Sequence, residues 1–406
     1  MNNMDTEKLS GPAGRIQDYL VFGEFGGVNP SIEDSSTFTF LSVEKMEELF
    51  EHEIEGCFLY SRHLNPTVYH LAKAMALLEN TEDSQITASG MAAISCSILQ
   101  ICQSGDEIIS SRTIYGGTYA LLKNFLPKFG IKTHFVNILD LDKVRDKVNK
   151  NTKILYCEAI SNPLLEVADI PALRKLADEF GLTLIVDNTF SPMMIQPYEL
   201  GAHLVVHSLT KYINGASDCV AGAVCGKHDF ILGMKDVHSG SAMLLGPVLD
   251  SIRAASILKN LRTLHIRIKQ HSKNAMYFAE NLEKLGFKVF YPGLASHPQN
   301  KRITEFLNQD YGYGGMLTFD AGTADIANSL MIKMQDHLIG YFAVSLGFYK
   351  TLFSSPGHST SSEIPENEQL AMGMSPGLIR MSIGLDNDIA RTFERMKECL
   401  KEMELI

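Results

Sequence analysis

The sequence predicts an α/β fold in which helices cover both faces of a mostly parallel β-sheet. Short apolar runs typical of buried strands recur along the middle of the chain, at 106–111, 133–138, 153–160, 182–190, 203–212 and 220–226. Helical patterns separate several of these runs, most clearly at 170–181. The chain has 406 residues, which at roughly 100–200 residues per domain allows two or three domains.

We expect the chain to divide into residues 1–65, 66–255 and 256–406. The first region has no long periodic segment, and we interpret it as an arm that packs on something else. The second holds the apolar runs and opens with helical patterns at 68–80 and 89–103, so it is expected to form the large sheet domain.

The third region mixes strand patterns with helices, which is typical of a smaller α+β domain. A helical pattern at 251–286 leads into it. Short strands are predicted at 288–293, 315–322, 342–348 and 378–385, and helices at 324–335 and 388–403. The polar, glycine-rich stretch 296–315 is predicted to be a long loop, and such loops in compact domains are usually functional.

Composition excludes several classes of protein. The formal net charge of −11 argues against binding to nucleic acid, which needs clustered Lys and Arg. No apolar run reaches the roughly 18 residues of a membrane helix, and the first 20 residues lack a secretory pattern. The seven cysteines are irregularly spaced, with no CxxC, and no metal-binding His pattern occurs. We therefore expect a cytoplasmic protein with reduced thiols, no bound metal and no membrane partner.

Polar residues follow several of the predicted strands. Glu158 ends one run, Asp187 ends the next, and Ser208, Thr210 and Lys211 end the third. In an open α/β sheet, ligands bind beyond the carboxyl ends of the strands. Asn162 comes shortly after the first of these runs. The sequence therefore predicts that an acid, a lysine and small hydroxyls meet at one edge of the sheet.

A further segment, Ser89-Gly90-Met91, lies at a predicted helix start, where free N–H groups favour an anion. Pyridoxal 5′-phosphate (PLP) is the cofactor whose chemistry uses all these parts: an amine for its aldehyde, a carboxylate for its pyridine nitrogen and a cradle for its phosphate. Taken singly, each residue is more often a surface, turn or capping residue. A nucleotide-binding reading is disfavoured, because no GxGxxG follows a strand and Ala221 interrupts the nearest P-loop-like run.

Eight motifs in the same order resemble the Cys/Met-metabolism family of PLP enzymes. They are YSRHLNPT, SGMAAI, YGGTYALL, SNPLLEVADI, VDNTF, VVHSLTKYINGASD, AVSLG and LIRMSIGL, and the resemblance runs from about residue 14 to the C-terminus. It implies the PLP-dependent aminotransferase-like fold (fold type I). Within the family, the segments at 241–247, 291–315 and 359–363 are most similar to plant-type methionine γ-lyases.

The resemblance implies a role for each matching residue. Lys211 would be the Schiff-base lysine and proton shuttle, Asp187 would pair with the pyridine nitrogen, and Tyr115 would stack on the ring and transfer protons at the leaving group. The remaining cofactor contacts would come from Ser89, Gly90, Met91, Glu158, Asn162, Ser208 and Thr210. Arg380, with Ser345, would hold the substrate carboxylate.

The resemblance also implies a shared active site. Tyr60 and Arg62 would reach the phosphate of a neighbouring subunit's cofactor, so the expected form is a homo-oligomer built from dimers, as a homotetramer. Some positions differ from the bacterial methionine γ-lyases. Gly117 stands where many of them have a cysteine, and His203 and Ala216 replace residues usual in the lysine motif.

The expected reaction is α,γ-elimination of L-methionine to methanethiol, 2-oxobutanoate and ammonia. The alternative within the family is γ-replacement, as in O-acetylhomoserine sulfhydrylase and cystathionine γ-synthase, or the cystathionine γ-lyase reaction. Two other readings are a PLP-bearing fold that has lost catalysis and a nucleotide-dependent dehydrogenase. The joint presence of Lys211, Asp187, Tyr115 and Arg380 argues against the first, and the second would require NAD(P) binding and another role for Lys211.

Overall fold

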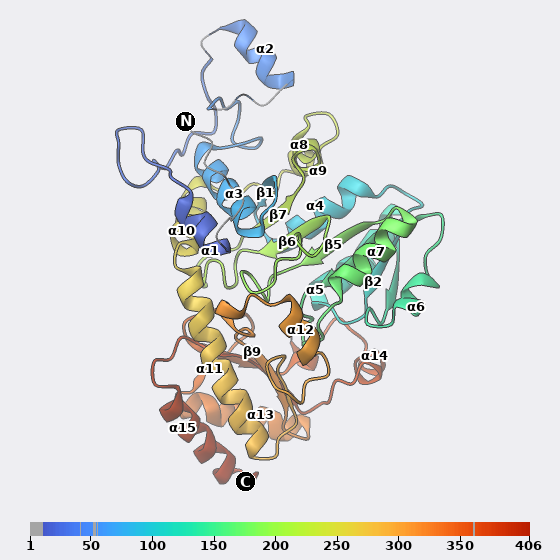
Figure 1. Ribbon diagram of the computed structural model, residues 1–406, viewed down its shortest axis with the longest axis vertical. Helices are drawn as coiled ribbons and strands as arrows, with labels where there is room; N and C mark the ends of the chain where they lie inside the picture. The colour runs from blue at the N-terminus through green and yellow to red at the C-terminus, as the bar shows by residue number, and fades with distance from the viewer. Residues whose placement is uncertain (1–10, 41, 52–53, 55, 360–361) are drawn as a thin grey trace.

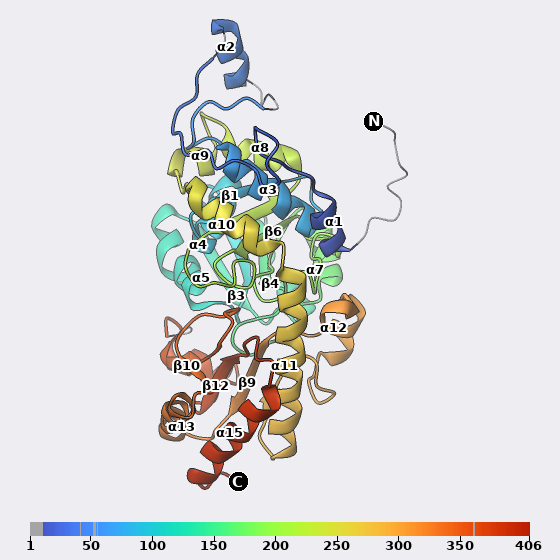
Figure 2. The ribbon, with the colours of Figure 1, turned by 90° about the vertical axis from the view of Figure 1, so that its left-hand side faces the viewer.

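The computed structural model describes residues 11–40, 42–51, 54, 56–359 and 362–406, which fold around two β-sheets (Figures 1 and 2). The larger sheet has seven strands in the order β1-β7-β6-β5-β4-β2-β3. Their bounds are β1 Asp83–Thr87, β2 Glu107–Ser111, β3 Lys132–Val136, β4 Thr152–Glu158, β5 Thr183–Asp187, β6 Leu204–Ser208 and β7 Gly222–Gly226.

The large sheet confirms the predicted mostly parallel arrangement. Strands β3, β2, β4, β5 and β6 pair in parallel, whereas β7 runs antiparallel to both β6 and β1. The sequence analysis missed β1, because its sequence DSQIT is polar and shows no apolar run. Its polar residues Asp83, Ser84 and Thr87 are nonetheless buried, so tertiary contacts override the sequence pattern.

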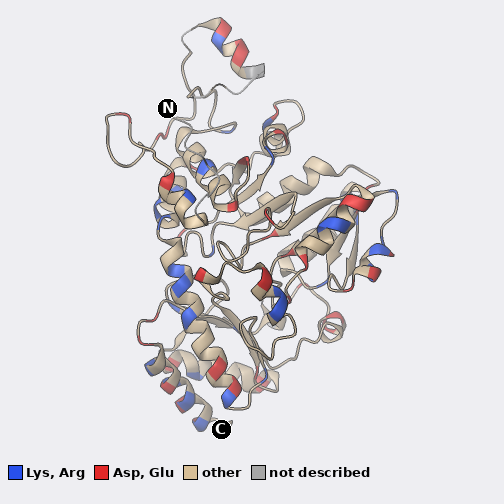
Figure 3. Cartoon of the chain, in the orientation of Figure 1, with Lys and Arg blue, Asp and Glu red and all other residues tan. Residues whose placement is uncertain are grey.

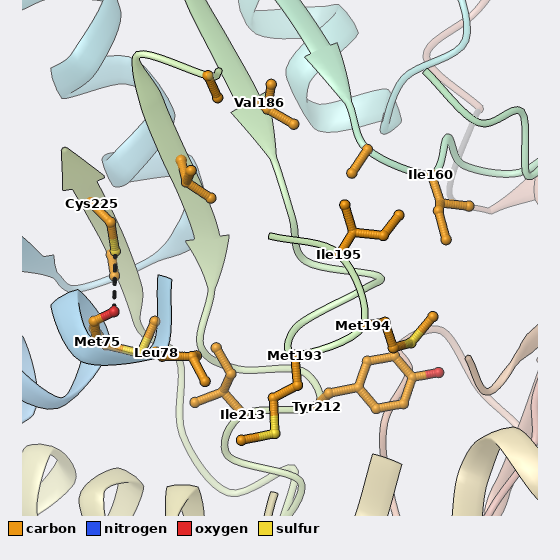
Figure 4. Close-up of a cluster of buried hydrophobic side chains, with 14 of the residues drawn as sticks. Met75, Leu78, Ile160, Val186, Met193, Met194, Ile195, Tyr212, Ile213 and Cys225 are labelled. Atoms are coloured by element: carbon orange, nitrogen blue, oxygen red, sulfur yellow. Dashed lines mark hydrogen bonds between the residues drawn. The ribbon is translucent and has the colours of Figure 1, made fainter. Parts of the chain in front are cut away.

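Helices cover both faces of this sheet. One core cluster joins the strands to α3 (Pro66–Glu79), α7 (Ile170–Phe180) and α10 (Ser251–Leu261). The other joins them to α4 (Gly90–Ile101), α5 (Gly116–Ala120), η1 (Leu121–Phe125), η2 (Leu126–Phe129) and α8 (His228–Lys235). Figure 4 shows part of the first cluster, in which α3 side chains Met75 and Leu78 pack near Cys225 of β7. Each fully buried Leu or Met contributes about 1.5–3 kcal/mol.

Local signals define the helices beside the site. Asn65 caps α3 by accepting from the backbone N–H groups of Thr67 and Val68, and Ser89 caps α4 by accepting from Ala92. Helix α7 begins after a capping Asp169 and ends at Phe180, just before Gly181, whose φ of +66° favours glycine. Short helices α6 (Leu141–Arg145) and α9 (Ser241–Leu245) complete this part of the chain.

The smaller sheet has five strands in the order β10-β11-β12-β9-β8. Its strands are β8 Val289–Phe290, β9 Met316–Asp320, β10 Gly340–Phe342, β11 Thr351–Ser354 and β12 Leu378–Ser382. The accompanying helices are α11 Leu264–Lys284, α12 Asn300–Phe306, η3 Gln309–Tyr311, α13 Ala324–Asp336, η4 Pro356–His358, α14 Glu366–Ala371 and α15 Ile389–Glu402. The long helix α11 runs beside this sheet and joins it to the large one (Figure 2).

Three predictions for this region were wrong in detail. The run 342–348 is mostly irregular, because strand β10 ends at Phe342 and β11 begins only at Thr351. The predicted loop 296–315 contains α12 and η3. The helical pattern 251–286 is broken at Arg262 and Thr263 into α10 and α11. The boundary predicted at 255/256 therefore falls inside α10, and the division into three regions stays a prediction.

The N-terminal region includes α1 (Pro12–Asp18) and α2 (Val43–Glu51). Arg15 fastens α1 to the body by donating to the carbonyls of Leu77 and Leu78 and to Gln196. Helix α2 stands away from the body in both views (Figures 1 and 2). Several apolar side chains before it are highly exposed, namely Leu20, Phe22, Phe25 and Val28. Such exposure is typical of a segment that contacts another chain.

Charged residues lie mainly on the outer helices and loops, where both signs are mixed (Figure 3). The strands of the large sheet carry few of them. Among the described residues, no helix combines the length and apolar character that a membrane span requires.

Candidate active site

A cavity of about 360 Å³ lies beyond the carboxyl ends of β4, β5 and β6. The start of α4 and part of the small-sheet region also line it. Its size falls within the range typical of small-molecule sites. Twelve of the fourteen predicted site residues line this cavity: Ser89, Gly90, Met91, Tyr115, Glu158, Asn162, Asp187, Ser208, Thr210, Lys211, Ser345 and Arg380.

Lys211 lies in the turn just after β6, and its Nζ donates to Ser345 Oγ at 3.0 Å. Burial and the nearby Arg380 guanidinium lower the pKa of Lys211 to about 8. Both effects disfavour the charged ammonium. A lysine with this pKa has a substantial neutral fraction near neutral pH, which is the form that attacks an aldehyde.

Asp187 ends β5, and its Oδ1 accepts from the backbone N–H of Thr189 at 2.9 Å. Tyr156 donates from its hydroxyl to Asp187 Oδ2 at 3.4 Å. Burial raises the pKa of Asp187, while the Thr189 hydrogen bonds oppose that shift. A cationic group that faces this carboxylate in the cavity would offset the effect of burial, and each charge would stabilise the other.

Glu158 ends β4 and holds two loops of the site together. Its Oε1 accepts from the Tyr115 N–H at 2.7 Å and its Oε2 from the Asn162 N–H at 2.8 Å. Burial and the neighbouring Asp187 raise the pKa of Glu158, and the two backbone hydrogen bonds work against them. Glu158 thus positions Tyr115 and Asn162 at the wall of the cavity.

The start of α4 packs closely against Ser208. A Cβ built on Gly90 would lie 2.8 Å from Ser208 Cβ, so only glycine lets the helix approach this closely. The first N–H groups of a helix have no partner within it. At this point they lie beside Ser208 and Thr210 on the cavity wall, which forms a cradle suited to a phosphate.

A family model for the Cys/Met metabolism PLP-dependent enzymes matches residues 17–395. The chain is also 45% identical over 388 residues to a methionine gamma-lyase of Arabidopsis thaliana, covering 94% of this chain and 88% of the relative. An L-methionine gamma-lyase of Pseudomonas putida is 35% identical over 385 residues, with 93% of each chain covered. The chain belongs to the family of Cys/Met metabolism PLP-dependent enzymes.

A solved structure supports the same family and fold. It is assigned as an O-acetylhomoserine (thiol)-lyase from Campylobacter jejuni and matches with a TM-score of 0.89 at 28% identity, covering 97% of this chain and all of that one. That protein carries a pyridoxyl-lysine phosphate. PLP, the cofactor of the family, fits the residues present here: an amine at Lys211, a buried carboxylate at Asp187 and the glycine-bearing cradle at the start of α4.

The small-sheet region supplies a cation to the cavity. Arg380 lies in β12, is only 3% exposed, and pairs with the strand residues Thr318 and Ser354. Its Nη1 donates to Asn162 Oδ1 at 3.2 Å and its Nη2 to the Ser345 carbonyl at 3.3 Å. Burial lowers the pKa of Arg380 to about 10, so it stays positive at neutral pH.

Tyr115 directly precedes α5, and its side chain is 43% exposed at the cavity. A Cβ at Gly117 would lie 2.5 Å from the Tyr115 ring carbon Cε1. The ring therefore occupies space that any side chain at position 117 would need. This explains why the glycine at this position suits the Tyr115 orientation seen here.

Several lining residues were not singled out from the sequence. Thr189 links two strands by accepting the Ser208 N–H at 2.9 Å, and it belongs to the VDNTF motif, so its place beside Asp187 was a usable signal. The others are Ile94, Ile160, Phe190, Val220, Val344, Leu346, Ser359 and Glu363. Ser359 and Glu363 lie in the 359–363 segment that resembles plant-type methionine γ-lyases, but nothing in that segment assigned either residue to the site.

Two predicted residues lie outside this cavity. Tyr60 is 41% exposed in the N-terminal region, and the Arg62 guanidinium carbon lies 5.8 Å from the Tyr60 ring centroid. Arg62 Nη1 donates to the Met243 carbonyl at 2.9 Å. Within one chain, therefore, neither residue lines the cavity that holds Lys211.

Proposed function

We propose that the protein cleaves L-methionine by α,γ-elimination, with water, to methanethiol, 2-oxobutanoate and ammonia. One observation supports this proposal most strongly: the cavity brings Lys211, Asp187, Tyr115 and Arg380 together in a chain with relatives named methionine gamma-lyases. Two such relatives match nearly the whole chain.

Arg380 and Ser345 would bind and orient the substrate. A guanidinium fork suits a planar carboxylate, and the Arg380 nitrogens already lie beside Asn162 and the Ser345 carbonyl. With the α-carboxylate held there, the γ-substituent would extend along the apolar part of the wall. That wall includes Val344, Leu346 and Phe190, which suit a thioether.

The remaining residues would hold the cofactor and move protons. Asp187 would keep the pyridine nitrogen protonated, and Ser89, Gly90, Met91, Ser208 and Thr210 would bind the phosphate. Bound PLP supplies an electron sink for negative charge at the substrate Cα. Lys211 would take the Cα proton and then move protons at Cβ and Cγ, while Tyr115 would transfer a proton at the leaving sulfur.

We propose that the active unit is a dimer in which Tyr60 and Arg62 of one chain reach the cofactor phosphate of the other, with dimers paired into a tetramer. The position of both residues outside their own cavity and the exposed apolar side chains from Leu20 to Val28 support a partner chain here. A cytoplasmic location is proposed because all seven cysteines are free.

Product analysis tests the reaction. Purified holoenzyme is incubated in parallel with methionine, homocysteine, cystathionine and O-acetylhomoserine plus a thiol, with Lys211→Ala as control. We expect 2-oxobutanoate and methanethiol from methionine, with none from the variant. The proposal is wrong if methionine gives no 2-oxobutanoate while O-acetylhomoserine and thiol are consumed, which would establish γ-replacement instead.

A further inference from the structure

Glu363 is an acidic residue at the cavity wall that the proposed chemistry does not use. It lies next to Ile364, which is 2% exposed and packs into the core cluster on the α4 side of the sheet. That anchor fixes the backbone, whereas the Glu363 side chain is exposed and lines the cavity together with Ser359. Among the described residues, none forms a hydrogen bond or an ion pair with the Glu363 side chain.

The other charges lining the cavity already have partners or assigned roles. The two cations are Lys211 and Arg380, and the proposed function commits them to the cofactor and to the substrate α-carboxylate. The Glu158 carboxylate is bonded to two backbone N–H groups, and Asp187 accepts from Thr189. Glu363 is therefore the one charge left for the remainder of a substrate among the described lining residues.

The rest of the wall offers no cation to a second anion. Most of its side chains are apolar, namely Ile94, Ile160, Phe190, Val220, Val344 and Leu346. The polar exception is Ser359, whose hydroxyl donates to the Ser355 carbonyl at 2.6 Å. An anionic group here would lose its hydration and would face a carboxylate, and both effects are unfavourable. A neutral thioether or ester would meet a mainly apolar surface and would avoid both costs.

The side chains of Glu363 and Tyr115 line the same cavity. After burial, the Glu363 charge is the largest influence that raises the pKa of Tyr115. Tyr115 is the residue assigned to proton transfer at the leaving sulfur, so the Glu363 charge acts on the group that would serve the γ-substituent.

We propose that Glu363 is a specificity-determining residue that excludes amino acids whose γ-substituent carries a negative charge. Succinyl and phosphoryl esters of homoserine are such substrates, whereas a methyl thioether or an acetyl ester is neutral. The inference rests on the proposed function for the orientation of the substrate, with its α-carboxylate at Arg380.

Binding of two amino acids with equal numbers of chain carbons tests the inference without any turnover. L-Norleucine ends in a methyl group and L-2-aminoadipate in a carboxylate, and neither has a γ-leaving group. Their dissociation constants for the holoenzyme are measured from the change in PLP absorbance, at low and at high ionic strength. The variants are Glu363→Gln and, as a matched control, Glu366→Gln, since Glu366 is exposed nearby on α14 but does not line the cavity.

We expect the parent protein to bind norleucine more tightly, with a preference that weakens at high salt. Glu363→Gln should reduce that preference by about three- to tenfold, mainly through tighter binding of aminoadipate. Glu366→Gln should leave it unchanged. The inference is overturned if Glu363→Gln has the preference of the parent protein, or if both variants change it equally.

This outcome can be separated from that of the proposed function. A protein that cleaves methionine but shows no effect of Glu363→Gln refutes only the charge selection. A protein that does not cleave methionine but loses its preference in Glu363→Gln refutes the proposed reaction and retains Glu363 as the selecting charge.

Discussion

Lys211 shows how the fold alters the chemistry of a single residue. In water a lysine amine is almost entirely protonated at neutral pH. Here burial and Arg380 lower its pKa to about 8, and Ser345 accepts a hydrogen bond from it. The neutral fraction at pH 7 rises from about 0.03% to about 9%. The sequence placed this lysine at a strand end but could not reveal the size of the shift, which depends on residues far along the chain.

The lowered pKa gives a pH prediction. The neutral amine attacks the aldehyde, and it becomes more abundant as the pH rises towards the pKa. The rate at which PLP binds covalently to the apoprotein should therefore increase with pH up to about 8 and then level off. Stopped-flow absorbance measures this rate. A rate that continues to rise tenfold per pH unit beyond 9 would show an unshifted lysine.

Replacement of Arg380 by lysine should affect substrate binding more than cofactor binding. Lysine keeps the positive charge but cannot direct two N–H groups at Asn162 and the Ser345 carbonyl. Arg380→Lys should raise KM for methionine by about 10- to 100-fold, which corresponds to about 1.4–3 kcal/mol. PLP absorbance should be retained. Steady-state kinetics and an absorbance spectrum check both parts, and an unchanged KM would contradict the assignment.

At the scale of single elements, strand ends were the most reliable guide to the site. Glu158, Asp187 and Ser208 end β4, β5 and β6 as their apolar runs predicted, because parallel strands present their carboxyl ends at one edge. The polar strand β1 and the irregular segment 343–350 could not be predicted in this way. Strand β1 forms because it pairs with β7. The path of segment 343–350 depends on its contacts with Lys211 and Arg380.

Ser345 illustrates the second case. Its φ of +140° lies in a region that favours glycine, and its side chain and carbonyl contact Lys211 and Arg380. Local strain of this kind is maintained by surrounding contacts and often marks a functional site. The apolar pattern FAVSLGF predicted a strand, but the structure has a bent connection that includes the strained Ser345.

The turn before α5 provides a test at this scale. A methyl group at position 117 would contact the Tyr115 ring, so Gly117→Ala should displace that ring from the cavity. We expect kcat for methionine to fall by about tenfold or more, because proton transfer depends on geometry. The melting temperature should change little, since the ring can rotate into solvent. Wild-type kcat in this variant would show that Tyr115 orientation is unimportant.

At the scale of the molecule, the cavity lies where the two sheet regions meet, so Arg380, proposed to bind the substrate, and Lys211, proposed to bind the cofactor, come from different parts of the chain. Sequence motifs identified both residues but not their neighbours in space. The N-terminal region differs again, because its apolar residues Leu20, Phe22, Phe25 and Val28 are highly exposed in the single chain.

Mixing two inactive variants tests the shared site. Lys211→Ala lacks the amine, and Arg62→Ala lacks the arm residue proposed to reach the partner's phosphate. In a mixed dimer, one site has both residues intact. Refolding equal amounts together should restore about a quarter of full activity, since half the dimers are mixed and half their sites are complete. Activity that never exceeds that of the separate variants would contradict a shared site.

The most direct measurement is reduction of the holoenzyme with borohydride, followed by proteolysis and mass spectrometry. We predict a single pyridoxyl label, on Lys211, and its loss in Lys211→Ala. A label on another lysine, or no label in yellow protein, would contradict the assignment of the cavity on which every residue role depends.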